Sequence, residues 1–442
     1  MGWVQYAAAL QRPVIISIMP IQHSLLFFLP LLLWSCGAAD TGVETPEGEP
    51  VPVRFNTYIA QDAASRAADH TPLSNITDIA SLRTVGFGVF GYYDDNKQYD
   101  NQTDIPNFMY NQSVTWNEAA NAWTYSPLKY WPNEAGGSES DGRTDRLSFF
   151  AYAPYLNSDS RLTCSANYHK GDPTVTYTTP EDLSQCLDVL YATKPDGTSP
   201  LTDLTKQNVG DSVTFSFHHT MSRLNFNVCA AFDEIAAGKN AIADSTRITV
   251  ESITLETDGD TPLFFTAGTL NLHTGSWTGT TNTDGSATPR LVLSDKALNP
   301  DVRDQGDKCV YQMKDANNKI IPGVDNTWRN AGNGYLTLVP NANPTSSTPK
   351  LKVTIVYHTT SDDPRLVLSS GRSRVKSTVS KTLSGFRFER GKAYAINLLI
   401  GMTTVKFSVQ VQNWRDPITF APMVDDWQNT SIIINFDKID TP

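Results

Sequence analysis

The sequence lacks the short signatures that mark the common enzyme classes. Its 442 residues contain no HExxH zinc motif, no GxSxG nucleophile elbow, no P-loop and no dinucleotide fingerprint. Carboxylates are plentiful, but nothing singles out a pair of them as the acid and base of a glycosidase. The sequence therefore predicts a protein that is not an enzyme and has no cofactor.

Metal-binding patterns are also missing. The chain has 7 histidines, and His218 and His219 are neighbours in a strand pattern, where adjacent side chains point to opposite faces. Residues 94–100 begin like a calcium loop. However, Tyr99 stands where the sharp turn needs glycine, and Ile105 where the loop needs a bidentate Glu. We therefore expect structural histidines and no metal site.

Basic residues are outnumbered by acidic ones. The chain has 35 Lys and Arg against 46 Asp and Glu, a formal net charge of −11. Nucleic-acid phosphates require clustered Lys and Arg. This balance excludes nucleic acid as an expected partner.

No apolar run is long enough to cross a bilayer, which needs roughly 20 residues. The run at residues 25–33 is shorter and leads into Leu33-Trp34-Ser35-Cys36, the pattern cut by lipoprotein signal peptidase. We therefore predict that residues 1–35 are a lipoprotein signal peptide and that Cys36 carries the lipid. The alternative is an ordinary signal peptide followed by a chance cysteine. A separate open choice is the start of translation, at Met1 or at Met19.

The segment after Cys36 has no apolar face. Residues 36–50 are mostly small, acidic or proline, a composition that cannot bury a core and is typical of a flexible tether. With several acyl chains on Cys36, the lipid would attach the chain to the outer membrane at the cell surface.

Cysteine is scarce, with five in the chain. If Cys36 is lipidated, the remaining four allow three pairings in an oxidising compartment. Cys164 and Cys186 flank one loop-like stretch and are the predicted disulfide. Cys229 lies in a strand pattern and is expected to be a small buried apolar residue.

Strand patterns dominate from residue 51 onward. In residues 51–59, Val53, Phe55 and Ile59 fall on one face, as period-two alternation predicts for a half-buried strand. Glycines separate the large residues of segment 85–93, which indicates a bulge or the close approach of another segment.

Short strands separated by turn signals predict an all-β protein built as a sandwich or barrel. The strand pattern lapses around residues 236–244. We therefore expect two domains of similar size, residues 51–238 and residues 239–442.

A series of strand motifs resembles the fimbrillin-like lipoproteins of Bacteroidetes, the Mfa-like subunits of type V pili. Each motif is weak alone, but together they run in the family's order through most of the chain. They are Tyr130-Trp131-Pro132, LSFFAYAP at 147–154, LDVLYA at 187–192, 213–228, 268–277, 390–398 and 405–414. The resemblance implies two tandem transthyretin-like β-sandwiches.

The resemblance also implies an assembly route with other pilus subunits as partners. A lipidated precursor is exported, a trypsin-like protease cuts after an Arg behind the first strand, and that strand leaves. Arg66, in a polar loop of the kind that proteases favour, is the candidate cut. Arg54 lies inside the strand pattern and Arg83 shortly before the next strand, so both are poorer sites.

In this route the vacated groove accepts a strand from the C-terminal segment of another subunit. Residues 415–442 are the possible donor, in which Ile432, Ile434 and Phe436 would share a face. Alternatively, residues 432–436 form the last strand of their own domain, or the two arrangements are successive states of one segment.

A second function class is a glycan-binding surface lipoprotein that does not polymerise. Trp116, Trp123, Tyr130 and Trp131 would form its sugar-stacking platform, although packing in the core and loops of a sandwich is the favoured explanation of these aromatics. A third class is an adhesin at the pilus tip, with a host or bacterial surface ligand as partner.

Overall fold

The computed structural model describes one compact unit within residues 50–442, and residues 1–49 form a separate unit that lies outside the described part. The predicted signal peptide and Cys36 are therefore not described, nor is the tether except for Pro50. The described residues are 50–59, 76, 78–132, 144–157, 159–164, 169–180, 185–210, 212–230, 246–258, 261–280, 290–294, 313–314, 320–321, 336–342, 349–362, 372–385, 387–400, 405–413 and 434–435.

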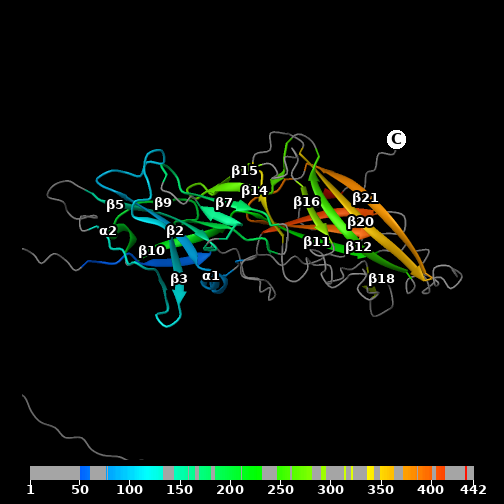
Figure 1. Cartoon of the computed structure of the whole chain (residues 1–442), viewed down its shortest axis with the longest axis horizontal. Helices are drawn as coiled ribbons and strands as arrows, with labels where there is room; N and C mark the ends of the chain where they lie inside the picture. The colour runs from blue at the N-terminus through cyan, green and yellow to red at the C-terminus, as the bar shows by residue number, and fades with distance from the viewer. Residues whose placement is uncertain are drawn as a thin grey trace, which may run out of the picture. The chain divides into compact units, whose positions relative to one another are not determined.

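Strands make up nearly all the regular structure of these residues (Figure 1). The described helices are short: α1 (Ile79–Val85) and α2 (Lys206–Val209). None of the helices within the described ranges is long and apolar enough to span a membrane. The all-β prediction is confirmed.

The largest sheet has eight strands in the order β1-β10-β8-β5-β2-β3-β4, with β9 paired to β5. Its neighbours are antiparallel except for β1 and β10, which run parallel. The strands are β1 (Phe55–Ile59), β2 (Phe87–Asp94), β3 (Met109–Asn117), β4 (Ala122–Thr124), β5 (Arg146–Ala153), β8 (Leu190–Thr193), β9 (Leu201–Leu204) and β10 (Val213–His219).

A four-stranded sheet joins segments that are far apart in the sequence. It has the order β15-β14-β7-β6, with strands β6 (Leu162–Cys164), β7 (Thr174–Thr178), β14 (Ala267–Asn271) and β15 (Ser276–Thr280). The central pair, β7 and β14, is antiparallel. This sheet combines strands from both sides of residues 238 and 239, where the division into two domains stays a prediction.

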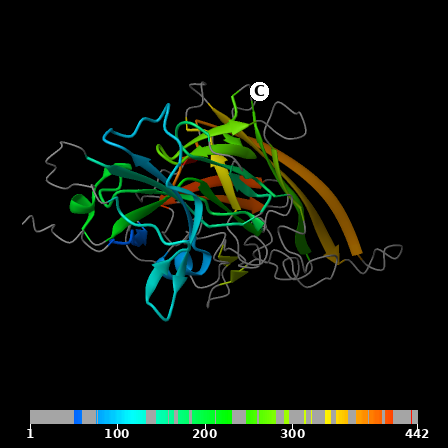
Figure 2. The same cartoon turned by 60° about the vertical axis from the view of Figure 1, so that its left-hand side comes forward.

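Two further sheets come mainly from the second half of the chain. One has the order β13-β19-β11-β22-β23-β24: β11 (Ser222–Ala230), β13 (Phe264–Phe265), β19 (Leu336–Pro340), β22 (Lys392–Ile400), β23 (Val405–Asn413) and β24 (Ile434–Asn435). The other has the order β16-β12-β20-β21: β12 (Thr246–Thr257), β16 (Arg290–Ser294), β20 (Lys350–Asp362) and β21 (Arg372–Ser384). Figures 1 and 2 show β20 and β21 as long neighbouring strands, and β17 (Met313–Lys314) pairs with β18 (Ile320–Ile321).

The positions of the hydrophobic cores explain which strands alternate between apolar and polar residues and which are apolar almost throughout. One core, around Phe55, Phe87 and Phe215, lies on one face of the eight-stranded sheet. A second core packs Phe90 and other residues of that sheet against Leu270 and its neighbours. Because β2 and β5 contribute to both cores, they are buried on both faces and are apolar almost throughout. A third core lies between the other two sheets.

Glycines and bulges in the strands follow the sequence pattern. The register of β2 against β3 shifts between Val89 and Gly91, and a Cβ on Gly88 would lie 2.4 Å from the Tyr152 ring. The predicted bulge and close approach in segment 85–93 are therefore confirmed. A second bulge, in β12, falls between Val250 and Ser252.

Candidate functional site: the first strand and its groove

β1 occupies one end of the eight-stranded sheet. Its register on β10 runs from Phe55 opposite Val213 to Ile59 opposite Phe217. Val53, Phe55 and Ile59 are buried in one core, where the Phe55 ring lies 5.3 to 5.6 Å from three other rings, those of Tyr125, Phe149 and Phe215. The apolar face of the first strand is thus a core face in this structure.

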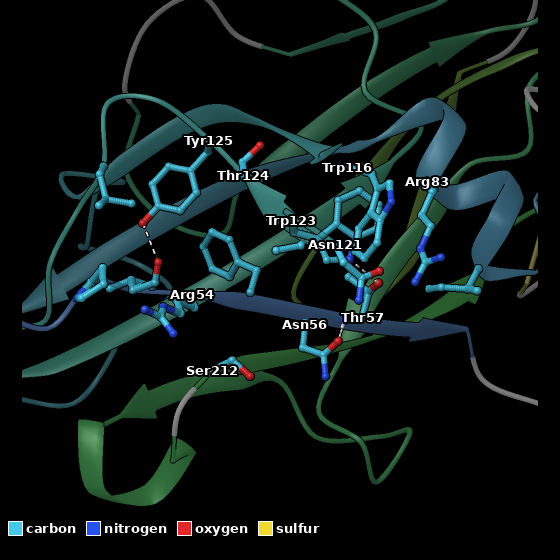
Figure 3. Close-up of a pocket in the computed structure, with 16 residues that line it drawn as sticks. Arg54, Asn56, Thr57, Arg83, Trp116, Asn121, Trp123, Thr124, Tyr125 and Ser212 are labelled. Atoms are coloured by element: carbon cyan, nitrogen blue, oxygen red, sulfur yellow. Dashed lines mark hydrogen bonds between the residues drawn. The ribbon is translucent and has the colours of Figure 1, made fainter. Parts of the chain in front are cut away.

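The residues just before β1 are hydrogen-bonded to residues 125–131, on the side of the strand that faces away from β10. The Val53 N–H donates to the Lys129 carbonyl at 2.9 Å, and the Trp131 N–H donates to the Val51 carbonyl at 2.9 Å. The Tyr125 hydroxyl donates to the Val53 carbonyl at 2.8 Å (Figure 3). Burial raises the pKa of Tyr125 to about 12, so this hydroxyl stays protonated and remains a donor at neutral pH.

Beyond Val53, the edge of β1 that faces away from β10 pairs with no described strand. Side chains hold it instead. The Trp123 indole N–H donates to Thr57 Oγ1 at 2.9 Å, and the Thr57 N–H donates to Asn56 Oδ1 at 2.9 Å. One edge of the strand therefore has a backbone ladder, and the other has mainly side-chain contacts.

A groove of about 690 Å³ follows this second edge. Residues 52–57 form one wall, and β4 with the residues after it forms another (Figure 3). Arg83 of α1 and Trp116 of β3 also line it, with the Arg83 guanidinium carbon 3.7 Å from the centroid of the Trp116 ring.

Local sequence explains where α1 places Arg83. Asp78 caps the helix: its side chain accepts the Ser81 N–H at 2.8 Å, and Ser81 Oγ accepts the Asp78 N–H at 3.2 Å. Such reciprocal bonds satisfy donors that an N-terminus otherwise leaves unpaired. The helix ends at Val85, and the next residue, Gly86, has a φ of +66°, which favours glycine. Arg83 therefore falls in the last turn, where α1 packs against β1 and β3.

The chain re-enters the described fold at Ile76, which is fully buried. Its N–H donates to Asp188 Oδ2 at 2.8 Å, and the other oxygen of this buried carboxylate lies 2.9 Å from His219 Nδ1. The candidate cleavage site Arg66 lies between Ile59 and Ile76, outside the described residues. The structure thus describes the residue on each side of segment 60–75, Ile59 before it and Ile76 after it.

The two adjacent histidines have separate partners, as the strand pattern predicts. His219 lies beside Asp188, while His218 Nε2 lies 2.9 Å from Thr193 Oγ1 and 3.2 Å from Ser216 Oγ. Among the described residues, no group of three or more His, Cys, Asp or Glu is arranged to hold a metal ion.

The segment that begins like a calcium loop folds around a lysine instead. Lys97 contacts both Asp94 and Asp104, and both carboxylates are buried. Burial and, next, the charge of Asp104 raise the pKa of Asp94 to about 7. Lys97 thus supplies the positive charge that these two carboxylates face.

The predicted disulfide is not formed. Cys164 and Cys186 are not joined in the structure, because they pack in different places. Cys186 belongs to the core between the two sheets of the second half, whereas Cys164 lies against the core that contains Phe90. Their positions on either side of a loop-like stretch did not bring their sulfur atoms together.

The candidate donor segment is described only at β24. Ile434 pairs with Val409 of β23 in an antiparallel ladder, so this part of the segment lies on its own chain here. Ile432 and Phe436 lie outside the described residues, and so does any face that the three would share.

The aromatic residues proposed as a sugar platform do not form one flat surface. Trp123 and Trp131 are buried, Trp116 is half-buried against Trp123, and Tyr130 is exposed. Sequence reasoning missed Arg54 and Arg83 as lining residues of the groove and weighed them only as cleavage sites. No local signal pairs Arg83 with Trp116, because a whole strand and a loop separate them.

The strand motifs and the fold are shared with known proteins. The profile of the family described as Fimbrillin-like matches residues 83–414. The chain belongs to the fimbrillin-like family. The fimbrium subunit Fim1C of Phocaeicola vulgatus is 25% identical to this fimbrillin-like chain over 347 residues, which cover 75% of the chain and 82% of that subunit. A fimbrial protein from Bacteroides vulgatus has a crystal structure with a TM-score of 0.56 at 21% identity, covering 82% of this chain and 99% of that one.

Family membership confirms the resemblance and assigns a general role. As a member of this family, the chain is a fimbrial subunit, and this role implies a place in a cell-surface pilus. The family is not enzymatic.

Proposed function

We propose that this chain is a type V pilus subunit, exported as an outer-membrane lipoprotein and assembled by protease-triggered strand exchange. Cys36 carries the lipid, residues 36–50 are the tether, and cleavage after Arg66 releases everything before Ala67. Residues 51–238 and 239–442 are then two transthyretin-like sandwiches, joined by the sheet that β7 and β14 share.

The main support for this proposal is the way in which β1 is paired and buried in the structure. The strand lies at the end of a sheet, with a backbone ladder on one edge and mainly side chains on the other. Together with Val53 just before it, the strand buries three apolar side chains, each contributing roughly 1.5–3 kcal/mol while it is in place. Its removal would expose the β10 edge and the core beneath it, which a strand with a similar apolar face can cover.

The anchoring of Ile76 supports a cut at Arg66. Because Ile76 is buried and bonded to Asp188, the chain after the cut would stay attached to the fold. Only the part before it would be free to leave. In the donor segment, Ile432, Ile434 and Phe436 would supply the replacement face after β24 leaves β23.

Arg66→Ala tests the cleavage step. This variant should fold and acquire lipid but keep its N-terminal segment, so neither processed subunit nor polymer ladders form in cells. Arg387→Ala, which removes an exposed Arg elsewhere, is the matched control and should polymerise normally. Gel analysis of surface extracts and N-terminal sequencing are the readouts. Normal ladders from Arg66→Ala would refute cleavage at that site.

A further inference from the structure

The groove beside β1 has a charge opposite to that of the chain. Arg54 and Arg83 line it, and none of its lining residues is Asp or Glu, although the whole chain has a net charge of −11. Neither guanidinium forms an ion pair with another described residue. Two positive groups without a counter-charge in one concavity favour an anionic ligand.

Two hydrogen-bond donors in the lining have no acceptor. Arg83 Nε and Trp116 Nε1 are buried and have no hydrogen-bond partner within the described structure. They belong to the stacked pair in which the guanidinium lies 3.7 Å above the ring centroid. A buried unsatisfied donor costs about 1–3 kcal/mol. A carboxylate has two acceptor oxygens, so a small movement of Arg83 would let one group satisfy both donors.

The rest of the lining suits a ring that carries hydroxyl groups. Trp116 and Tyr125, both half-buried, supply aromatic surface, and the buried Trp123 packs beside Trp116. Side-chain amides and hydroxyls surround these rings. These polar groups belong to Asn56, Asn121, Thr124 and Ser212 (Figure 3). Sites that orient a small ligand combine apolar surface with a few such polar groups, and volumes of roughly 300–1,000 Å³ are typical. The groove lies within this range.

We propose that this groove binds a pyranose that carries a carboxylate, such as a uronic or sialic acid. The carboxylate binds at Arg83 and Trp116, and the sugar ring packs on the aromatic side chains. Arg54, at the other end of the groove, donates to a ring hydroxyl (Figure 3). Residues 52–57 form one wall, so the site exists only while β1 is in place. Binding to the uncut chain does not depend on whether strand exchange occurs.

The test compares two sugars that differ only in the charged group. Methyl glucuronide and methyl glucoside are titrated into the purified, uncut full chain, and binding is measured by ligand-observed NMR and calorimetry. The glucuronide should bind at least tenfold more tightly, and salt should weaken its binding.

Variants then locate the site. Arg54→Gln and Arg83→Gln should each weaken glucuronide binding at least fivefold. Trp116→Phe, which keeps a ring but removes the indole donor, should weaken it at least twofold. Arg387→Gln removes an equal charge from an exposed position outside the groove and should leave binding unchanged. Because Arg54 is exposed, its variant keeps the test valid even if Arg83→Gln fails to fold.

Several outcomes would overturn the proposal. They are equal binding of the two sugars, binding of neither, and unchanged binding in the Arg54→Gln variant. A glutamate-rich peptide that displaces the glucuronide and binds more tightly would show that the groove takes acidic peptides instead of sugars.

Discussion

Gly275 shows how a single turn residue is restricted in two independent ways. Its φ of +67° lies in the left-handed region, and an added Cβ would lie 2.3 Å from the Tyr191 ring. The Gly275 carbonyl also accepts a bond from Arg390 Nη1 at 2.9 Å. The turn between β14 and β15 thus contacts residues of two other family motifs, 187–192 and 390–398, which are distant from it in the sequence.

Gly275→Ala should lower the free energy of unfolding by about 3 kcal/mol, because left-handed strain and a ring clash add together. Gly385→Ala is the matched control: its φ is +73°, but an added Cβ there would contact nothing within 4 Å. It should cost only about 1 kcal/mol. Urea denaturation measures both values. Equal costs would show that the ring contact is unimportant.

At the scale of elements, β1 is held both by its backbone ladder with β10 and by buried aromatic side chains. The Val213 N–H donates to the Arg54 carbonyl at 2.8 Å, while the Phe55 ring packs among several aromatic rings. Side-chain burial therefore accounts for much of what keeps this short strand in place.

Phe55→Ala should weaken the seating of β1 by about 3–4 kcal/mol, the usual cost of removing a buried phenyl ring. Tyr58→Phe, which removes only the hydroxyl bonded to the Pro195 carbonyl, should cost about 1 kcal/mol. Hydrogen exchange at the Val213 amide reports this loosening, and Phe55→Ala should accelerate it far more than Tyr58→Phe. Equal exchange in both variants would argue against Phe55 as the anchor.

The sequence predicted β1 well because burial of one face leaves a period-two trace in the strand itself. The parallel pairing of β1 with β10 leaves no such trace, since pairing between distant segments depends on the whole topology. The groove was missed for the same reason: Arg54, Arg83 and Trp116 come from different elements. The prediction of a disulfide between Cys164 and Cys186 was wrong because sequence position alone does not determine the distance between two sulfur atoms.

At the scale of the whole molecule, one carboxylate links three distant segments. Asp172, just before β7, accepts bonds from Tyr99 at 3.0 Å and Asn271 at 2.9 Å, and it lies 2.8 Å from His273 Nδ1. Burial acts to raise the pKa of Asp172, but these hydrogen bonds outweigh it and leave that pKa below its usual value. Asp172 thus helps to hold β14 against β7.

Asp172→Ala should lower the free energy of unfolding by about 2–4 kcal/mol at pH 7, because it leaves three half-buried partners without their hydrogen-bond acceptor. A carboxyl pKa that is lowered by folding stabilises the protein above the unfolded pKa of about 3.9 and loses that effect as pH falls. The difference from the natural chain should therefore shrink near pH 3.

Asp159→Ala is the control for this prediction. Within the described part of the chain, Asp159 bonds only to Arg161, two residues away, so its loss should cost about 1 kcal/mol or less. Denaturation curves at pH 7 and pH 3 provide the comparison. A pH-independent effect of Asp172→Ala would contradict an ionised Asp172 in the folded state.

The β7–β14 ladder has a mechanical consequence for a pilus subunit. Its register runs from Ala267 opposite Thr178 to Asn271 opposite Thr174, so two distant parts of the chain are joined by backbone hydrogen bonds. When a pilus is pulled, tension passing along the chain between these parts would load that ladder directly. The subunit would then resist stretching as one block until the ladder shears, and the released chain would lengthen the fibre in a single step.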